Sequence, residues 1–183
     1  VSDLEFLNDV LSVDYPENGD FSRIKTLWPS YSNHRTVFDQ LRLINLYGKE
    51  AVRINYAKDG AYATPAEELQ DKSDRYYFQK TISMKQGGIY ISPLDLNVEK
   101  GAIRLPIMPV IRLATPFFDA GGEKQGILIL NYAAADILSQ IEAIASSSFG
   151  GIYFLNDQSY WLFDSGDSTK EWAFSYDPDS TVK

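Results

Sequence analysis

The sequence offers few side chains that could carry out covalent catalysis. It contains no cysteine and a single histidine, His34, which lies among serine, asparagine and arginine in a loop-like stretch. A Ser-His-Asp site would have to use this histidine as its base. The sequence also lacks the Gly-x-Ser-x-Gly turn that exposes a nucleophilic serine. We therefore expect no catalytic residue in this chain and a protein that is not an enzyme.

The acidic and glycine-rich segments are better explained as loops than as metal or phosphate sites. Asp95 and Glu99 could pair for acid-base chemistry, but they lie in a connection that contains proline and asparagine. Segment 121–126 is rich in glycine but lacks the Lys-Ser/Thr ending of a phosphate-binding loop. The acidic cluster at 164–167 does not have the spacing of an EF-hand calcium loop. The sequence therefore predicts no metal and no cofactor.

Arg75 has the side chain chemistry that best suits recognition of a small anion. Its planar guanidinium can hold a carboxylate through two parallel hydrogen bonds. The alternative is a salt bridge to Asp71 or Asp74, which are close in sequence. Tyr77 and Tyr90 could offer ring faces and hydroxyls to a ligand in a largely apolar pocket, or they could pack in the core. Both interpretations stay open for these three residues.

Further candidates come from strands in which polar and apolar residues alternate. Arg112 and Ser92 each alternate with apolar neighbours on a predicted strand. Residues two apart on a strand face the same side of the sheet, so Ser92 shares a face with Tyr90. We include both as ligand-binding residues. Arg53 and Asp95 could touch a ligand or form a structural ion pair or turn.

The composition excludes several classes of partner. A formal net charge of −8 and an isoelectric point near 4.6 oppose binding to nucleic acid, because phosphate contacts need clustered lysine and arginine. With 44% hydrophobic residues, a chain of this length can bury a core. No apolar run approaches the ~20 residues that span a bilayer, and the N-terminus lacks a signal-peptide pattern. We expect any membrane anchor to lie in segments outside this chain.

The N-terminal segment predicts an amphipathic helix followed by an irregular connection. Between residues 1 and 11, Val1, Leu4, Leu7 and Leu11 recur at helical spacing. Ser2 and Glu5 match a capping box, and the apolar stripe could pack on the core or on a partner. Residues 13–32 are rich in turn-forming types and are expected to be irregular.

A strand hairpin and a helix start are expected next. The runs 38–46 and 51–56, separated by Tyr-Gly-Lys-Glu, predict a β-hairpin. In the second run, Val52, Ile54 and Tyr56 share one side of the strand, and Arg53 and Asn55 share the other, less apolar side. Residues 64–67 (Thr-Pro-Ala-Glu) combine three helix-start signals. We expect a helix there, a break near residue 72, and a second helical piece that includes Tyr77 and Thr81.

The remaining pattern completes an α+β fold. Residues 89–92, 110–118 and 126–132 predict three more strands, and isoleucines between 136 and 145 predict a helix. A last alternating pair, 151–155 and 159–163, predicts another hairpin. Consecutive strands without helices between them favour a central antiparallel sheet of about five strands flanked by helices.

Five segments carry a family resemblance when they are taken in order. They are residues 71–78 (DKSDRYYF), 88–99 (GIYISPLDLNVE), 109–116 (PVIRLATP), 126–132 (GILILNY) and 153–162 (YFLNDQSYWL). From about residue 38 onward the chain resembles the double Cache family of PAS-like (PDC-type) sensor domains of bacterial and archaeal transmembrane receptors. No single segment is diagnostic, and the order of several is fairly specific.

The resemblance implies an architecture and a location. In such receptors a long N-terminal helix leaves a first transmembrane segment, two PAS-like modules stack outside the membrane, and a second segment leads to a cytoplasmic output domain. It implies here an N-terminal helix and connection (1–37), a membrane-distal sensor module (38–146) and the start of a membrane-proximal module (147–183). It also implies an extracytoplasmic location and a homodimer formed through the N-terminal helix.

The resemblance also implies where a ligand binds. Family members that bind amino acids have an arginine, two aromatic residues shortly after it, a later tyrosine, and an aspartate on the last strand that holds the ligand's amine. The matching positions are Arg75, Tyr77, Phe78, Tyr90 and Asn131. Asn131 is neutral and cannot compensate an ammonium as a carboxylate would, and Phe78 lacks a hydroxyl. These departures favour an uncharged or purely anionic ligand over an amino acid.

Two functional hypotheses follow from the sequence. The first is a ligand-sensing domain of a histidine kinase, diguanylate cyclase or chemotaxis transducer that binds a small polar, carboxylate-bearing molecule through Arg75, Tyr77, Tyr90, Ser92, Arg112 and Asn131. Ligand binding would then shift the population between two receptor arrangements. The alternative is an interaction module that contacts a partner protein and has a filled core in place of a pocket.

Overall fold

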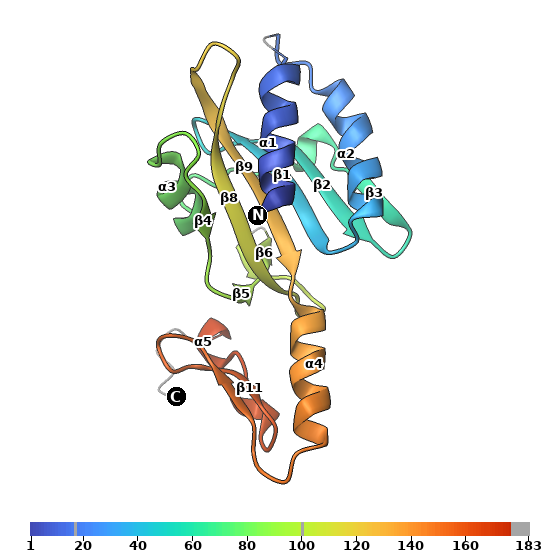
Figure 1. Cartoon of the computed structure of the whole chain (residues 1–183), viewed down its shortest axis with the longest axis vertical. Coiled ribbons are helices and arrows are strands. Elements are labelled where there is room, and N and C mark those ends of the chain that lie inside the picture. Colours follow the sequence, from blue (N-terminus) through green and yellow to red (C-terminus); the bar gives the residue numbers. More distant parts are fainter. Residues whose placement is uncertain (17, 100, 177–183) are drawn as a thin grey trace. The chain divides into compact units, whose positions relative to one another are not determined.

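The computed structural model describes residues 1–16, 18–99 and 101–176 (Figure 1). The helices are α1 (Ser2–Asp14), α2 (Ser22–His34), α3 (Tyr76–Ile82), α4 (Ala135–Ser146) and α5 (Ala173–Tyr176), with short 3-10 turns η1 (Ala66–Glu68) and η2 (Ser168–Lys170). The strands are β1 (Phe38–Asn45), β2 (Glu50–Ala57), β3 (Gly60–Ala63), β4 (Tyr90–Ile91), β5 (Asp95–Leu96), β6 (Val98–Glu99), β7 (Ala102–Ile103), β8 (Pro109–Phe118), β9 (Lys124–Ala133), β10 (Tyr153–Leu155) and β11 (Trp161–Asp164). Residue contacts divide the chain into unit 1 (1–92 and 111–132) and unit 2 (93–110 and 133–183).

An antiparallel sheet forms the centre of unit 1, in the order β3-β2-β1-β9-β8-β4. The hairpin signals in the sequence are confirmed, because β1 pairs with β2 and β9 lies on the other side of β1. The observed strand bounds differ from the expected ones by one or two residues, and the short strands β3, β5, β6 and β7 were not predicted. The fold class is the mixed α+β class with an antiparallel sheet that the sequence pattern predicts.

The two N-terminal helices α1 and α2 cover one face of this sheet, which we call the α1–α2 face (Figure 1). The expected stripe of α1 is buried there, and Leu4, Leu7 and Leu11 are at most 2% exposed. The stripe therefore packs on the protein's own sheet. The expected capping box does not form, since Val1 is the N-cap and no side chain caps the helix.

The expectation of an irregular connection over 13–32 is wrong from residue 22 onward, where α2 begins. Serine, asparagine and Pro29 weaken the local helix signal, but Ile24, Trp28 and Ser32 recur at helical spacing and are buried. Burial of this stripe against the sheet outweighs the cost of a proline inside the helix. Tertiary packing, and not local propensity, decides the structure of this segment.

A polar contact joins α1 to α2. The Tyr31 hydroxyl donates to Asp3 Oδ1 at 2.5 Å, and Arg35 Nη2 lies 2.6 Å from the same carboxylate. The Arg35 guanidinium holds the pKa of Asp3 below its ordinary value. Burial, together with the hydrogen bond to Asp3, raises the pKa of Tyr31 to about 12. The two helices are thus fixed to one another at the surface of unit 1.

The opposite face of the sheet, which we call the α3 face, carries α3 and the segment 64–75 that leads to it. The helix expected to begin at Thr64 is only the single turn η1, and no side chain caps it. The Thr64 hydroxyl instead accepts hydrogen bonds from Arg53 Nε and Asn55 Nδ2. The second helical piece is confirmed as α3, with Tyr77 and Thr81 buried.

Unit 2 contains the expected helix and last hairpin. The helix α4 spans Ala135–Ser146, and β10 pairs with β11 in antiparallel fashion. Its core is small and centres on Leu96, Leu162 and Trp172. No residue of α4 is fully buried. The last seven residues of the expected 147–183 module lie outside the described residues.

Among the helices of the described residues, none has the length and apolar character that a bilayer crossing requires.

Candidate ligand site

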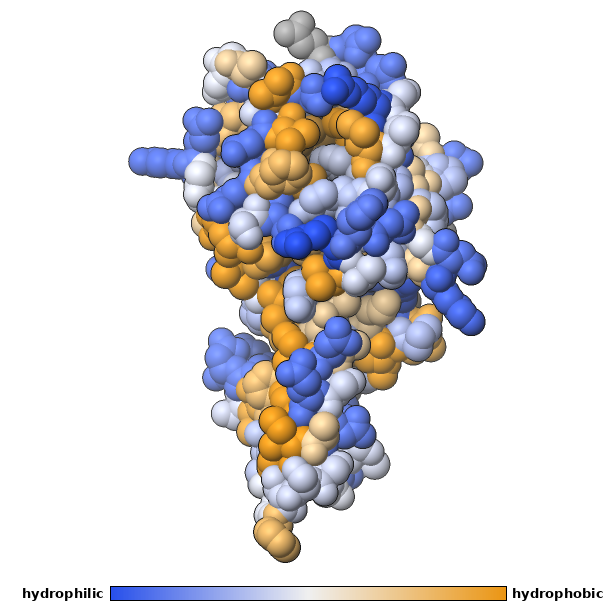
Figure 2. Space-filling view, turned by 45° about the vertical axis from the view of Figure 1, so that its right-hand side comes forward, coloured by the Kyte–Doolittle hydropathy of each residue, from blue (hydrophilic) through white to orange (hydrophobic). Residues whose placement is uncertain are grey.

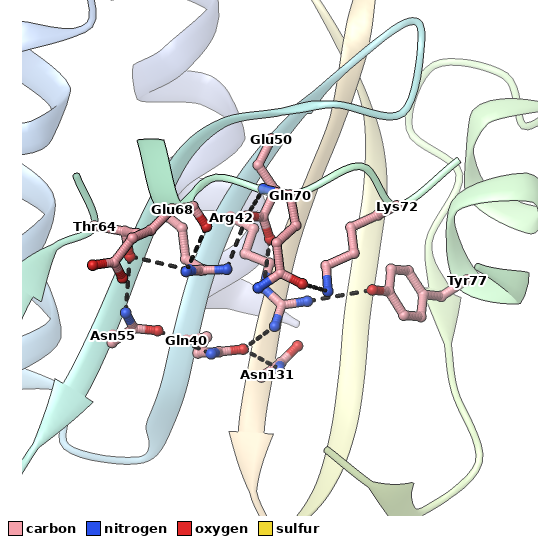
Figure 3. A network of polar contacts seen from close by, with 11 residues as sticks. Gln40, Arg42, Glu50, Asn55, Thr64, Glu68, Gln70, Lys72, Tyr77 and Asn131 are labelled. Atoms are coloured by element: carbon pink, nitrogen blue, oxygen red, sulfur yellow. Dashed lines mark hydrogen bonds and ion pairs between the residues drawn. The ribbon is translucent and has the colours of Figure 1, made fainter. Parts of the chain in front are cut away.

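The α3 face differs from the α1–α2 face because polar residues alternate with leucines along β1. Leu41 and Leu43 point into the α1–α2 core, whereas Gln40 and Arg42 point to the α3 face. This alternation follows from the two-residue period of a strand. A connected set of residues, which we call the polar network, is built on this face (Figure 3). Its members are Gln40, Arg42, Glu50, Arg53, Asn55, Thr64, Glu68, Gln70, Lys72, Tyr77 and Asn131.

Arg42 lies at the centre of the polar network and is 1% exposed. Its Nη1 donates to the Tyr77 hydroxyl at 3.3 Å, its Nη2 donates to Gln40 Oε1, and its Nε lies 3.4 Å from Glu50 Oε1. Burying a guanidinium is costly unless it is paired and hydrogen-bonded. These contacts stabilise the guanidinium beneath α3.

Glu50 is shared between two arginines. Arg42 lies directly opposite Arg53 in the pairing of β1 with β2, so two like charges face each other. Glu50 Oε2 accepts from Arg53 Nη1 at 3.0 Å, while Oε1 lies near Arg42. Arg53 also donates to Thr64 Oγ1. Of the alternatives for Arg53, the structural ion pair is present.

The segment 64–75 is bound to the network and to the turn between β1 and β2. Gln70 N donates to Glu50 Oε2 at 2.9 Å, and Lys72 Nζ donates to Gln70 Oε1 at 2.8 Å. Lys72 N donates to the carbonyl of Gly48 at 2.7 Å. Gly48 has a φ of +84°, and a Cβ there would lie 2.5 Å from Ser73. A glycine is therefore required where this segment crosses the turn.

Three amide side chains form a row across the sheet. Gln40 lies opposite Asn55 on β2 and opposite Asn131 on β9. Gln40 Nε2 donates to Asn55 Oδ1 at 2.9 Å, and Asn131 Nδ2 donates to Gln40 Oε1 at 3.0 Å. Asn131 is 0% exposed. The last-strand asparagine is thus linked to Arg42 through Gln40.

Arginine and tyrosine side chains form the part of the site next to α3. The Arg112 guanidinium carbon lies 5.0 Å from the centre of the Tyr77 ring, and the Arg75 guanidinium carbon lies 5.8 Å from it. Arg112 Nη1 donates to the Tyr76 hydroxyl at 3.3 Å. Both guanidiniums are within the range of cation–π attraction. Arg75 makes no ion pair with Asp71, Asp74 or any other residue in the described part of the chain.

Tyr90 and Ser92 lie in or next to the edge strand β4, which pairs with β8, the strand that carries Arg112. Ser92 Oγ accepts from the backbone N–H of Arg112 at 2.9 Å, and Tyr90 lies opposite Ala114. The Tyr90 ring packs in the apolar cluster that also contains Tyr77 and Phe78. Ser92 thus fixes the backbone that carries Arg112, and Tyr90 lines the apolar margin.

The six candidates from the sequence fall on one face of unit 1. Arg75 and Arg112 each lie within cation–π range of the Tyr77 ring, and Asn131 is linked to Tyr77 through Gln40 and Arg42. The sequence analysis missed Gln40 and Arg42, because residues 38–46 were treated as one apolar run. The missed signal is the Gln-Leu-Arg-Leu alternation at 40–43.

The arrangement offers hydrogen-bond donors and positive charge that can bind an anion. Among the described residues, the buried charged side chains of unit 1 are Asp39, Arg42, Glu50, Arg53, Lys72 and Arg112. Cations therefore outnumber carboxylates in this interior. Guanidiniums and tyrosine hydroxyls are hydrogen-bond donors that match carboxylate oxygens. No group of three or more metal-binding side chains is found in the described part of the chain.

Solved structures with the same architecture include sensory domains and an extracellular domain of signalling proteins. The extracellular domain of the histidine kinase vpHK1S-Z8 is 22% identical with a TM-score of 0.72, and the match covers 97% of this chain and 70% of that one. A domain of a sensory box/GGDEF family protein from Vibrio parahaemolyticus is 24% identical with a TM-score of 0.65, and the match covers 77% and 56%. The sensory domain of the Campylobacter jejuni chemoreceptor Tlp3 with isoleucine bound is 11% identical with a TM-score of 0.63, and the match covers 100% and 71%. This chain has the Cache-type, PAS-like sensor fold.

A comparison of the sequence with family models identifies the family of this chain. The family model described as the sensor domain of bacterial histidine kinases matches residues 3–174, so this chain belongs to the bacterial histidine kinase sensor domain family. No curated protein matches the sequence. The chain spans 56% to 71% of the length of the three structures above. As a sensor domain, it is not itself the catalytic part of a receptor.

Proposed function

We propose that this chain is the extracytoplasmic part of a transmembrane receptor and that it senses a small polar, carboxylate-bearing molecule on the α3 face. The observation that carries the proposal is the burial of Arg42 and Arg112, each 1% exposed, next to Tyr77. Apolar residues in place of buried charged groups are often as stable or more stable, so the presence of these arginines supports a role in binding. A carboxylate would be held by guanidinium and tyrosine donors together.

Each proposed residue has a distinct role in this site. Arg75 and Arg112 bind the carboxylate, and the Tyr77 ring lies close to both guanidiniums. Tyr90 closes the apolar side of the site. Ser92 acts indirectly, because its hydroxyl fixes the backbone of Arg112. Asn131 contacts the part of the ligand beyond the carboxylate.

Signalling would use the connection between this site and the rest of the receptor. A ligand that bridges α3 and the sheet stabilises the arrangement in which both bind it, and differential affinity is what shifts such an equilibrium. We propose that residues 38–146 form the membrane-distal module and that residues 147–183 begin a membrane-proximal one. The output is a histidine kinase, diguanylate cyclase or chemotaxis transducer domain in the same receptor.

A thermal-shift screen tests the ligand class. A ligand that binds only the native state raises the melting temperature, so carboxylates should raise it and amines or neutral sugars should not. In Arg112→Gln the shift should disappear. The matched control is Arg23→Gln, since Arg23 lies on the surface with a side chain that is 72% exposed, and here the shift should remain. If no carboxylate raises the melting temperature, or if Arg112→Gln keeps the full shift, the proposed function is wrong.

A second candidate function is contact with a protein partner without any small ligand. It is favoured by apolar side chains that reach the surface on the α1–α2 side of unit 1, among them Phe6 (55% exposed), Leu27 (48%) and Val13 (83%). Figure 2 shows apolar side chains gathered at the surface of this unit. The partner proposed is a second copy of the chain, with α1 at the contact. A dimer in light scattering that Phe6→Ser abolishes, together with no carboxylate response, would support this alternative.

A further inference from the structure

The orientation of the amide row on the α3 face is dictated by Arg42. A guanidinium has N–H donors and no acceptor, so the group of Gln40 that faces Arg42 must be its oxygen, Oε1. The other end of the Gln40 amide, Nε2, then donates to Asn55 Oδ1 at 2.9 Å. Asn55 Nδ2 in turn donates to Thr64 Oγ1 at 2.8 Å. The donor and acceptor roles of Gln40, Asn55 and Thr64 in these contacts therefore follow from the position of Arg42.

The same reasoning fixes the orientation of Asn131. Because Gln40 Oε1 is an acceptor, Asn131 must turn its Nδ2 toward it, and the two atoms lie 3.0 Å apart. Asn131 Oδ1 therefore points away from Gln40 (Figure 3). This oxygen is buried and has no hydrogen-bond partner among the described residues. A buried acceptor without a donor is costly, so the site has an acceptor that a ligand can satisfy.

The nature of this acceptor discriminates among ligands that share a carboxylate. A hydroxyl can donate to a neutral amide oxygen and carries no charge. An ammonium at the same point would lack the carboxylate that normally compensates it. It would also lie close to the Arg42 guanidinium, which bonds to the same Gln40 oxygen as Asn131. A hydrogen atom in place of the hydroxyl would leave Asn131 Oδ1 without a donor.

We propose that the site selects a small 2-hydroxycarboxylate. Arg75 and Arg112 bind its carboxylate, and its hydroxyl donates to Asn131 Oδ1. This inference rests on the proposed function, because it requires the carboxylate to bind on the α3 face. Asn131 is then the residue that determines specificity between hydroxy acids and amino acids.

Calorimetric titration with matched sets of three compounds tests the inference. Each set keeps the carbon skeleton and changes only the group next to the carboxylate. Suitable sets are glycolate, acetate and glycine; L-lactate, propionate and L-alanine; and L-2-hydroxyisovalerate, isovalerate and L-valine. In at least one set the hydroxy acid should bind about tenfold or more tightly than the other two. Equal binding of the hydroxy acid and the plain carboxylate would mean that water satisfies Asn131 Oδ1, and would overturn the inference.

Substitution of Asn131 gives an independent test. Asn131→Asp places a carboxylate at this point, so the amino acid should become the tightest binder of its set. Asn131→Ala removes the acceptor and should equalise the hydroxy acid and the plain carboxylate. The matched control is Asn45→Asp, which adds the same charge at the end of β1 where Asn45 accepts from the N–H groups of Tyr47 and Lys49. It should leave the wild-type order unchanged.

The outcomes separate this inference from the proposed function. Circular dichroism and thermal unfolding of each variant establish that it is folded before binding is compared. If the wild-type protein binds L-alanine or L-valine as tightly as the hydroxy acid, or if Asn45→Asp changes the order as Asn131→Asp does, the inference is wrong but the carboxylate site stands. If no compound of any set binds, both the inference and the proposed function are wrong.

Discussion

The two faces of the central sheet are made by alternate residues of the same strands and differ in character, because only the α3 face carries the polar network. On the α1–α2 face, Leu41, Leu43 and Leu128 pack against leucines of α1 and against Trp28. On the α3 face, the neighbours of Leu41 on β1 are Gln40 and Arg42, and Ile127 and Ile129 of β9 pack with Tyr77 in a second apolar cluster. The first face buries apolar surface, which is the main source of stability. The second face buries donors, acceptors and charges, which give specificity at a cost in stability.

This difference shows where the fold and the function are encoded. Two adjacent residues of β1, Leu41 and Arg42, are both at most 1% exposed. Leu41 is buried among apolar side chains. Arg42 is buried among polar side chains, and it sets the orientation of the Gln40 amide. A substitution on the first face should therefore act on stability and leave ligand choice unchanged. A substitution on the second face should act on ligand choice or on both.

The largest effect is expected for Leu41→Ala on the α1–α2 face. Leu41 is 0% exposed within the main apolar cluster, so the truncation leaves a cavity and should lower the free energy of unfolding by about 3 kcal/mol. Urea unfolding measures this change. Leu46→Ala, at a leucine that is 44% exposed just beyond β1, should change it by less than about 0.5 kcal/mol. Equal losses in the two variants would contradict the assignment of the core to this face.

A smaller effect is expected for Thr64→Val on the α3 face. The substitution keeps the shape of the side chain but removes the oxygen that accepts from Arg53 Nε and Asn55 Nδ2. Loss of this buried acceptor should lower the free energy of unfolding by about 2 kcal/mol. Thr64→Ser keeps the oxygen and should recover most of the loss. If valine is as stable as threonine here, the polar network does not depend on this hydroxyl.

The smallest effect is expected at the surface pair that joins α1 to α2. Arg35 holds the pKa of Asp3 below its ordinary value of 3.8, so the pair stabilises the folded state above that pH and the contribution is lost as the pH falls through the lowered value. Asp3→Asn should lower the free energy of unfolding by about 0.5 kcal/mol near neutral pH, because exposed ion pairs are screened by solvent. Wild type and variant should converge in strong acid. A difference that persists in strong acid would rule out this charge pair as its cause.

Much of the fold is predictable from the sequence, because it follows from local periodicity. The stripe of α1, the hairpin of β1 with β2, and α4 each carry a clear repeat. The helix α2 does not, because Pro29 and several serines hide a stripe that is stabilised only by the sheet beneath it. Thr64 shows the converse, where strong helix-start signals give only one turn because the hydroxyl binds Arg53 and Asn55.

The candidate site is only partly predictable, because its geometry depends on strand register. Arg75, Tyr77, Arg112 and Asn131 could be named from residue type, strand alternation and family resemblance. The contact of Gln40 with Asn131 could not be predicted, since β1 and β9 are distant in sequence. The orientation of Asn131 depends in turn on Arg42, a residue that a hydrophobicity pattern includes in an apolar run.

The most direct test of the account compares the two faces in one nuclear magnetic resonance titration with the carboxylate that raises the melting temperature most. The arginine Nε–H signals of Arg42 and Arg112, assigned with lysine variants, report on the α3 face. The indole N–H of Trp28, which is 3% exposed on the α1–α2 face, reports on the other. We expect the two arginine signals to shift and saturate together while the Trp28 signal stays in place. A shift at Trp28 with none at Arg42 or Arg112 would contradict a ligand site on the α3 face.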